Sequence, residues 1–344
     1  MKFLLPIGLL TILCACQTAP ETIIDATELA EPVLEDAQLS VDNVKPCPGI
    51  TASKDATHND DCETSDEGII KVIHPTEQVE IALDEPDPID PNSLNNLWEK
   101  IQYQLALSIP DDQARLDAQR KWFLRHPDYM GRVSKRARPF LYHIVKRLNE
   151  ENMPIELALL PIVESAYDPF AYSHGRASGM WQFIPGTGKR FGMKQTWWYD
   201  GRRDVIASTD GAIKYLKYLN KMFDGDWLHA LAAYNSGEGR VLRAIKKNKA
   251  KGKSTDFWSL ELPKETRAYV PKLLALADIL KHQDKYNFKW PAITNAPVVE
   301  IVNVGSQIDL ALAASMAGLT IAELQALNPG YNRWATDPDG DPTG

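Results

Sequence analysis

The fold and the candidate chemistry of this chain centre on one stretch, Ile162–Gly192, which runs IVESAYDPFAYSHGRASGMWQFIPGTGKRFG. Its single glutamate, Glu164, ends a strongly apolar run that starts at Ile155. A carboxyl group in apolar surroundings is poorly solvated, which favours its neutral form and raises its pKa. Aromatic residues and glycines follow Glu164 closely. A poorly solvated carboxylic acid beside aromatic rings and glycines is typical of a carbohydrate cleft with a general acid. These residues are Gly175, Gly179, Gly186, Gly188 and Gly192, with Tyr167, Tyr172, Trp181 and Phe183.

A structural role for the same residues stays open on composition alone. Glu164 is equally compatible with the end of a core helix, where it would form a salt bridge before a series of turn glycines. The motif pattern along the chain therefore has to decide between the two interpretations.

Four ordered motifs resemble the lytic transglycosylases, and most closely their D type. They are Glu164-Ser165, Gly179-Met180-Trp181-Gln182 before Phe183-Ile184-Pro185, Ala233-Tyr234-Asn235, and Glu265–Val270, which contains Tyr269 where that family keeps a further tyrosine. Four motifs in order over about 110 residues are a far more specific signal than one short pattern. The sequence departs from the family at Trp181, where many relatives have methionine, which changes the lining of the pocket rather than the chemistry.

The resemblance implies a mainly α fold with a lysozyme-like helical catalytic domain, similar to that of goose-type lysozymes, over residues 151–290. Residues 93–150 are expected to form a helical extension that packs on it. Apolar residues at helical spacing, such as Leu97, Ile101 and Leu105, support this expectation. Asp204, Asp226 and Pro263 precede further apolar-periodic runs and suit helix starts.

A different pattern begins at Val298. Val299–Val302 alternates like a short strand, and residues 310–317 and 321–327 indicate two short helices closed by Asn328-Pro329-Gly330. Residues 298–334 thus resemble a degenerate LysM glycan-binding module, a small α+β unit, without a recognisable second strand. D-type relatives commonly carry more LysM repeats here, so we expect either a fragment or a shortened form.

The resemblance also implies a mechanism with one acid. Glu164 would protonate the oxygen that links N-acetylmuramic acid to N-acetylglucosamine, and then accept a proton from the C6 hydroxyl to close a 1,6-anhydro ring. Ser165, Gln182 and Asn235 would contact the sugar amides and hydroxyls. Cleft-lining roles are implied for Met180, Trp181 and Tyr234, and Tyr269 would orient Glu164. Peptidoglycan glycan strands are the expected substrate, and cell-wall remodelling the expected role.

Most glycosidases use two carboxylates, so a second acid has to be considered. Asp200, Asp204, Glu238 and Glu265 are the candidates, and each also suits a helix start or a solvated surface. Two alternatives to the lyase stay open: a lysozyme-like hydrolase that uses water, and a wall-binding lipoprotein without catalysis.

Charge is unevenly distributed along the 344 residues, whose formal net charge is -8. Residues 17–95 hold 19 acids and 3 lysines, whereas residues 96–296 hold 33 Lys and Arg and 21 Asp and Glu, with a basic run at Arg240–Lys253. We expect an acidic disordered tether over residues 16–92, followed by a basic body. Nucleic acid is not an expected partner, because no nucleic-acid-binding signature accompanies the basic charge.

The N-terminus predicts secretion. Lys2 precedes the apolar run Phe3–Leu13, which is short for a membrane span and typical of a signal peptide, here residues 1–15. Leu13-Cys14-Ala15-Cys16 resembles a bacterial lipobox, which implies cleavage before Cys16 and lipidation of that cysteine. The resemblance implies three acyl chains on Cys16, which are enough to anchor a protein stably to a membrane. Gln17 after the cysteine favours the periplasmic face of the outer membrane. An ordinary secreted protein is the alternative.

Other sites are weakly indicated. In an oxidising compartment Cys47 and Cys62 either form a disulfide or remain two free thiols. No metal or organic cofactor is expected, since His174 and His229 lack ligand spacing with other His or Cys residues. We expect a monomer.

Overall fold

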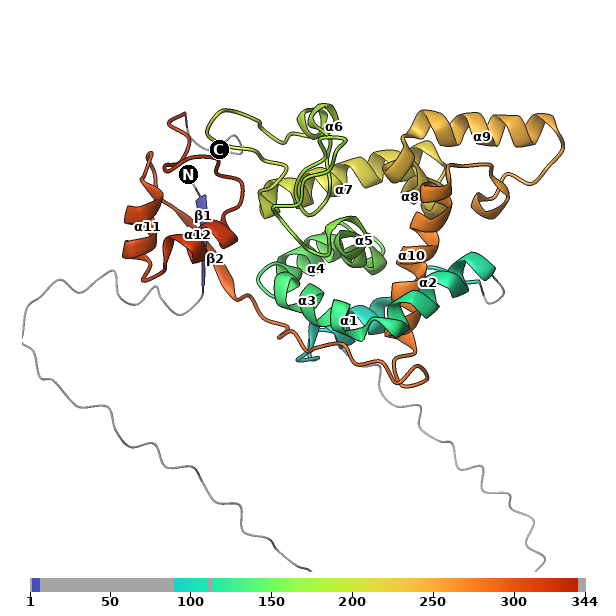
Figure 1. Ribbon diagram of the computed structural model, residues 1–344, viewed down its shortest axis with the longest axis horizontal. Helices are drawn as coiled ribbons and strands as arrows, with labels where there is room; N and C mark the ends of the chain where they lie inside the picture. Colours follow the sequence, from blue (N-terminus) through green and yellow to red (C-terminus); the bar gives the residue numbers. More distant parts are fainter. Residues whose placement is uncertain (1, 7–89, 111–112, 340–344) are drawn as a thin grey trace, which may run out of the picture. The chain divides into compact units, whose positions relative to one another are not determined.

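The computed structural model describes residues 2–6, 90–110 and 113–339 (Figure 1). Between residues 97 and 281 the described regular structure is helical, as the 3.6-residue spacing of its apolar side chains predicts. The longer helices are α1 (Leu97–Gln104), α2 (Ala114–Arg125), α3 (Pro127–Ala137), α4 (Leu141–Glu150), α7 (Val205–Met222), α8 (Trp227–Ser236), α9 (Glu238–Ala250) and α10 (Lys264–Lys281). Short helices connect them: η2 (Ile155–Leu159), α5 (Leu160–Ser165), α6 (Pro185–Arg190) and η3 (Phe257–Ser259).

The predicted helix starts are confirmed by their caps. The side chain of Asp204 accepts a hydrogen bond from the backbone N–H of Ala207 at 2.8 Å, and Asp226 accepts one from His229 at 2.9 Å. Pro263 directly precedes α10. Each of the two aspartates thus satisfies a backbone donor that has no partner within its helix.

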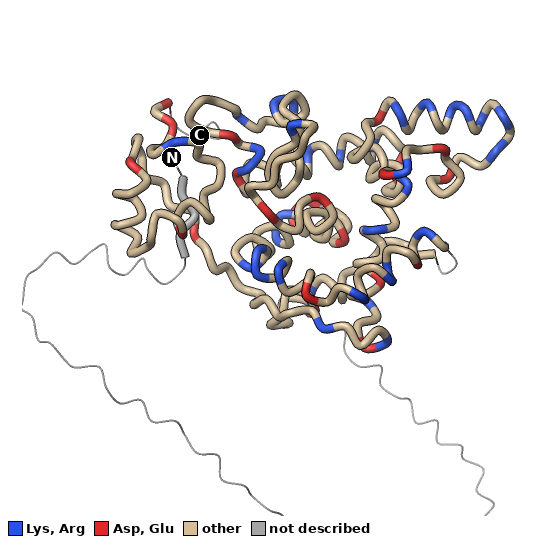
Figure 2. Tube along the Cα trace, in the orientation of Figure 1, with Lys and Arg blue, Asp and Glu red and all other residues tan. Residues whose placement is uncertain are grey.

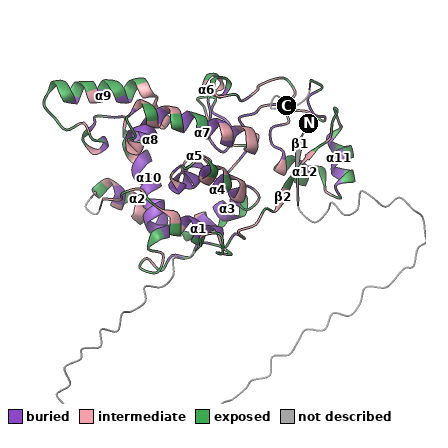
Figure 3. Ribbon diagram, turned by 180° about the vertical axis from the view of Figure 1, so that it is seen from behind, coloured by how far each residue is buried: buried purple, intermediate pink, exposed green. Residues whose placement is uncertain are grey.

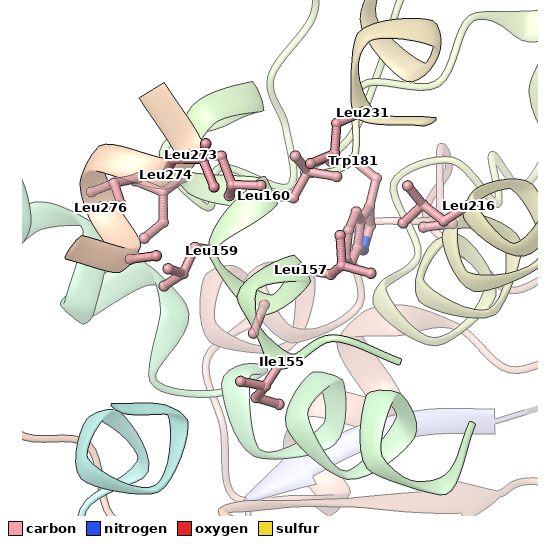
Figure 4. Packing of buried hydrophobic residues seen from close by; sticks show 14 of the residues in the cluster. Ile155, Leu157, Leu159, Leu160, Trp181, Leu216, Leu231, Leu273, Leu274 and Leu276 are labelled. Carbon is pink, nitrogen blue, oxygen red and sulfur yellow. The ribbon is translucent and has the colours of Figure 1, made fainter. Parts of the chain in front are cut away.

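Helix α10 is the central element of the core. It packs against α2, α8, α5, η2 and α1, and Figure 3 shows it buried along most of its length, whereas α9 is largely exposed. Figure 4 shows Leu159 and Leu160 facing Leu273 and Leu274 of α10, all of them fully buried. Burial of each such leucine contributes about 1.5–3 kcal/mol. The helix that carries Glu164 is therefore held firmly against α10.

The N-terminal helices share this core. Buried apolar side chains from Leu97 to Ile293 form one continuous cluster. The buried carboxylate of Glu156 accepts hydrogen bonds from the backbone N–H groups of Ala106 and Leu107, both at 2.6 Å. Arg120 of α2 pairs with Asp278 of α10 at 2.6 Å. The domain boundary at residue 150 stays a prediction, and packing is continuous across it.

The C-terminal segment contains β2 (Val299–Asn303), α11 (Leu310–Met316) and α12 (Ile321–Leu327), close to the predicted bounds. It has a small core of its own, made of Leu310, Ala313, Ala314 and Leu324. A capping box between Thr320 and Glu323 starts α12. The prediction of a mainly α fold with a small unit of strand and helices at its end is confirmed.

The partner of β2 comes from the other end of the chain. Residues Lys2–Pro6 form β1, which pairs antiparallel with β2 so that Lys2 lies opposite Asn303 and Pro6 opposite Val299. Strand β1 lies inside the predicted signal peptide. The lipidation predicted at Cys16, the pairing of Cys47 with Cys62, and the tether up to residue 89 fall outside the described residues.

One bent pair of helices in the part of the chain that the structure describes matches a membrane span by length and composition. No single helix there has the length and apolar composition to cross a bilayer, and only the bent pair α11 and α12, at 99° to each other, passes that test by length and composition. Figure 2 shows Lys and Arg concentrated along α9, which contains most of the predicted basic run.

Candidate active site

A cavity of about 750 Å³ lies where α5, the segment before α6, α8 and α10 meet. Its lining includes Glu164 at the end of α5, Gln182 before α6, Tyr234 and Asn235 at the end of α8, and Tyr269 on α10. Residues that are up to 105 positions apart in the sequence are thus neighbours here. This volume lies within the range of ligand-binding pockets in proteins.

The backbone after Glu164 directs its side chain into this cavity. Helix α5 stops one residue later, because Ala166 and Tyr167 adopt left-handed conformations with φ of 54° and 59°. The fully buried ring of Tyr167 compensates for this strain through packing, and its hydroxyl donates a hydrogen bond to the carbonyl of Ala158 at 2.6 Å. Glu164 therefore occupies a sharply terminated helix end.

The environment of Glu164 favours its neutral form. Burial raises the pKa of its carboxyl from 4.5 to about 7, against a lowering effect of the hydrogen bond that Tyr269 donates to Oε1. The negative charge of Glu265 raises this pKa further, and the Lys272 ammonium lowers it. The side chain keeps partial exposure because one side faces the cavity. A carboxyl group with a pKa near 7 can both give and accept a proton at neutral pH.

Tyr269 is a fixed donor to this carboxyl. Burial, and next the charge of Glu164, raise the pKa of its phenol well above the ordinary value, so the hydroxyl stays protonated. A donor to the ionised carboxylate stabilises the charged form more than the neutral form. Tyr269 therefore supports the state of Glu164 that has lost its proton.

Two amide side chains face the cavity, and one offers a hydrogen-bond acceptor while the other offers a donor. The Gln182 Nε2 group donates to the carbonyls of Gly179 at 2.7 Å and Ala171 at 3.3 Å, which leaves Oε1 as an acceptor. In Asn235 the oxygen is occupied, because Thr266 Oγ1 donates to Oδ1 at 2.8 Å, and the NH₂ group remains as a donor. One acceptor and one donor match the N–H and C=O of an acetamido group.

Gly179 is required by the fold at this point. Its φ is +82°, and a Cβ atom would lie 1.8 Å from the carbonyl oxygen of Arg202. Only glycine fits a left-handed position against another backbone. The close approach places Gln182, itself at φ 50°, where its Nε2 reaches the Gly179 carbonyl.

Three further predicted residues lie behind the cavity wall. Met180 and Trp181 are fully buried, and the indole N–H donates to Thr209 Oγ1 at 3.1 Å. The Ser165 hydroxyl donates to the carbonyl of Met180 at 3.0 Å and accepts from the backbone N–H of Asp168. None of the three side chains lines the cavity. Their predicted contact with substrate stays untested, and their contacts support a role in holding the wall.

Tyr234 connects that wall to the cavity. Its hydroxyl donates to the backbone carbonyl of Trp181 at 2.9 Å, and its ring packs edge-on against Phe183 at 5.8 Å between centroids. Burial, with the charge of Glu164 as the second cause, raises its pKa well above the ordinary value. Tyr234 is therefore a neutral group that ties α8 to the segment before α6.

The four candidate second acids separate into two pairs. Glu238 and Glu265 line the cavity. Asp200 is paired with Arg202 at 2.7 Å, and Asp204 caps α7. Only Glu238 and Glu265 are thus candidates for a second carboxylate in the cavity.

Sequence reasoning missed Lys272 and Tyr215, which also line the cavity. Lys272 follows Tyr269 by three residues, so helical spacing alone places both on one face of α10. Burial, and then the nearby Glu238, raise the pKa of Tyr215 above its ordinary value. No sequence pattern singled out Tyr215, since it lies in the middle of α7.

Residues that would hold a metal are absent from the described ranges, which contain no group of three or more His, Cys, Asp and Glu side chains arranged to bind an ion. His229 has partners in the fold: Asp226 contacts its Nδ1 at 2.8 Å and the carbonyl of Thr255 its Nε2 at 2.9 Å.

Two family models match the chain. The transglycosylase SLT domain covers residues 142–257, and the LysM-like domain of lytic transglycosylase MltD covers residues 298–343. The first match contains Glu164, Gln182 and Asn235, and the second covers the strand and helices that follow residue 298.

Membrane-bound lytic murein transglycosylase D of Escherichia coli (strain K12) is 50% identical over 235 residues, which are 68% of this chain and 52% of that protein. The chain thus spans about half the length of these transglycosylase D relatives. A putative tributyltin chloride resistance protein of Alteromonas sp. (strain M-1) is 44% identical over 177 residues, or 52% of this chain and 84% of that protein.

Among solved structures, an inactive mutant of the lytic transglycosylase Slt from Pseudomonas aeruginosa overlaps with a TM-score of 0.36 and 21% identity, over 59% of this chain and 33% of that one. The two family models and the transglycosylase D relatives at 50% identity carry the assignment. The chain belongs to the lytic transglycosylase family, and within it to the membrane-bound D type.

Proposed function

We propose that this chain cleaves the bond between N-acetylmuramic acid and N-acetylglucosamine in peptidoglycan and leaves 1,6-anhydro ends. The observation that carries the proposal is the partly enclosed carboxyl of Glu164, whose pKa is raised to about 7 by burial, at a cavity where Gln182 leaves one acceptor and Asn235 one donor available. The names of the D-type relatives, lytic murein transglycosylases, agree with this substrate.

In the first step Glu164 acts as the acid. Its protonated form gives a proton to the glycosidic oxygen, and the bond from that oxygen to C1 of the muramic acid breaks. The positive charge that develops is carried by the 2-acetamido group or by an ion-like state of the ring. The neutral form is available near neutral pH because burial opposes ionisation.

Gln182 and Asn235 hold the acetamido group during this step. The Gln182 Oε1 accepts from its N–H, and the Asn235 NH₂ donates to its carbonyl oxygen, in the orientations that Gly179 and Thr266 impose. Each such hydrogen bond typically contributes about 0.5–1.5 kcal/mol. Their joint effect is to fix the sugar relative to Glu164.

In the second step the ionised Glu164 acts as the base. It accepts the proton of the C6 hydroxyl, whose oxygen then bonds to C1 and closes the anhydro ring, and Glu164 returns to its neutral form without consuming water. The hydrogen bond from Tyr269 stabilises the carboxylate between the two steps. One acid thus suffices for both proton transfers.

Product analysis tests this proposal. Digestion of purified sacculi followed by mass spectrometry is expected to give muropeptides one water lighter than hydrolysis products. A Glu164→Gln variant should bind glycan strands without releasing products. Wild-type turnover by that variant would refute the assignment of the acid.

A lysozyme-like hydrolase is the second candidate, favoured by the presence of Glu238 and Glu265 in the same cavity. Either carboxylate could act as the base that activates water in an inverting enzyme, or as the nucleophile in a retaining enzyme. Reducing-end muropeptides as the main product, lost in Glu238→Gln or Glu265→Gln, would establish it. For a non-catalytic wall-binding protein, neither product would form.

We also propose that lipid attached to Cys16 anchors the chain to the periplasmic face of the outer membrane, where it remodels the cell wall. The relatives named membrane-bound support an association with a membrane. Cleavage before Cys16 would remove β1 and leave β2 without that strand. Radiolabelled palmitate incorporation that disappears in Cys16→Ala is the expected result, and unchanged labelling would contradict the anchor.

A further inference from the structure

A second cavity of about 290 Å³ adjoins the first. Val163 and Lys272 line both, so the two spaces meet on either side of the residue before Glu164. The remaining lining of the second cavity includes Gln119 and Trp122 of α2 and Tyr129 of α3. Its far wall thus lies outside residues 142–257, which the SLT-domain model covers.

Two polar side chains in this second cavity, Lys272 and Gln119, have no hydrogen-bond or ion-pair partner among the described residues, although the Lys272 charge acts electrostatically on Glu164. Neither the Lys272 ammonium nor the Gln119 amide forms a hydrogen bond or ion pair there, although both are only partly exposed. Tyr129 differs, because its hydroxyl already donates to the carbonyl of Ile162 at 3.0 Å. The cavity therefore offers one cation and one amide to a ligand.

Trp122 adds an aromatic surface. This residue is 40% exposed, and the imidazole of His126 stacks on its ring at 4.6 Å between centroids. Edge contacts with Phe123 and Tyr129 hold the ring in place. A rigid exposed indole is a favourable contact surface for aliphatic groups.

The charge of Lys272 indicates which chemical group of peptidoglycan the second cavity would bind. Uncharged sugar rings offer hydroxyl and acetamido groups, which the amides of the first cavity already match, whereas an unpaired ammonium favours a carboxylate. In peptidoglycan, free carboxylates are carried by the peptide stems attached to muramic acid. A stem also supplies backbone amides for Gln119 and aliphatic side chains for Trp122.

We propose that the second cavity receives the peptide stem of the muramic acid bound next to Glu164, with Lys272 pairing a stem carboxylate and Trp122 packing on the stem. The assignment rests on the proposed function. It makes Lys272 and Trp122 specificity-determining residues for stem-bearing glycan.

The test compares two substrates that differ only in charge. One is soluble glycan strands with native stems, and the other is the same strands with stem carboxylates converted to amides. Wild type is expected to show a kcat/KM about five- to tenfold higher on the native strands, the range for a charge-assisted contact that is partly exposed. In Lys272→Met this ratio should fall to about one.

Using a ratio separates stem binding from an effect on Glu164. Lys272 also lowers the pKa of Glu164, so its loss can change both rates together, but that change cancels between substrates. Trp122→Ala should lower kcat/KM on both stem-bearing substrates, with Trp122→Phe restoring most of it. Lys121→Met is the matched control, because Lys121 is exposed and lines neither cavity, and it should keep the wild-type ratio.

Equal rates of wild type on the two substrates, or a wild-type ratio in folded Lys272→Met, would overturn the proposal. If wild type cleaves neither substrate, the proposed function fails instead. Binding of the two strands by Glu164→Gln then tests the stem contact on its own: tighter binding of native strands, lost on adding Lys272→Met, supports it, and equal binding refutes it.

Discussion

Replacing Tyr269 by phenylalanine removes the donor to Glu164 and leaves the ring in its buried position. The hydrogen bond lowers the pKa of Glu164, so its loss should raise that pKa above the present value of about 7. A higher pKa keeps the acid protonated to higher pH. The variant is therefore expected to retain its acid form further into the alkaline range.

The size of the shift follows from the difference between two hydrogen bonds. A bond to a charged group contributes about 1.5–3 kcal/mol and one to a neutral group about 1 kcal/mol. The difference of about 0.5–2 kcal/mol corresponds to about one pKa unit, at 1.36 kcal/mol per unit. The carboxyl should thus titrate near pH 8 in Tyr269→Phe.

The assay is kcat/KM against pH on soluble glycan strands, because this ratio reports ionisation in the free enzyme. Since the first step needs protonated Glu164, kcat/KM should fall on the alkaline side with a midpoint near pH 7 in wild type and about one unit higher in the variant. Tyr215→Phe is the control, because Tyr215 lines the cavity without contacting Glu164, and its midpoint should match wild type. A midpoint that stays or moves to lower pH in Tyr269→Phe would refute the reasoning.

Three other substitutions have expected outcomes. The pKa of Glu164 is about 7 in the folded protein and 4.5 as the reference, so the stabilisation from its neutral form is complete below pH 4.5 and is lost as the pH rises through 7. The free energy of unfolding of Glu164→Gln, measured by urea titration, should therefore exceed that of wild type by up to about 3 kcal/mol at pH 8 and differ little at pH 4. Gly179→Ala should cost about 3 kcal/mol or more, because its Cβ would lie 1.8 Å from the Arg202 carbonyl oxygen, and a neutral result in the same titration would contradict the required glycine. Thr266→Val removes the donor that orients Asn235 and should lower kcat/KM about tenfold in a folded protein; an unchanged value would show that the amide orientation does not depend on it.

Local patterns sufficed for much of the helical fold. Helix starts at Asp204 and Asp226 depend on side chains that bond backbone N–H groups three residues away, and such short-range chemistry is visible in the sequence. Val299 at the start of β2 was located equally well from alternation. The pairing of β2 with β1 was not, because strand partners so distant in the chain leave no local pattern.

In the candidate site, too, local sequence indicated some residues, and only the tertiary structure placed the others. The motifs singled out Glu164, Gln182 and Asn235, which line one cavity in the structure, and the apolar run before Glu164 predicted its neutral form. Only the tertiary structure decided that Trp181 lies behind the wall while Lys272 lies beside the acid, because exposure depends on which helices pack together. Short-range hydrogen bonding and periodicity are encoded residue by residue, whereas the direction of a side chain relative to a cavity is set by packing between elements that are far apart in the chain.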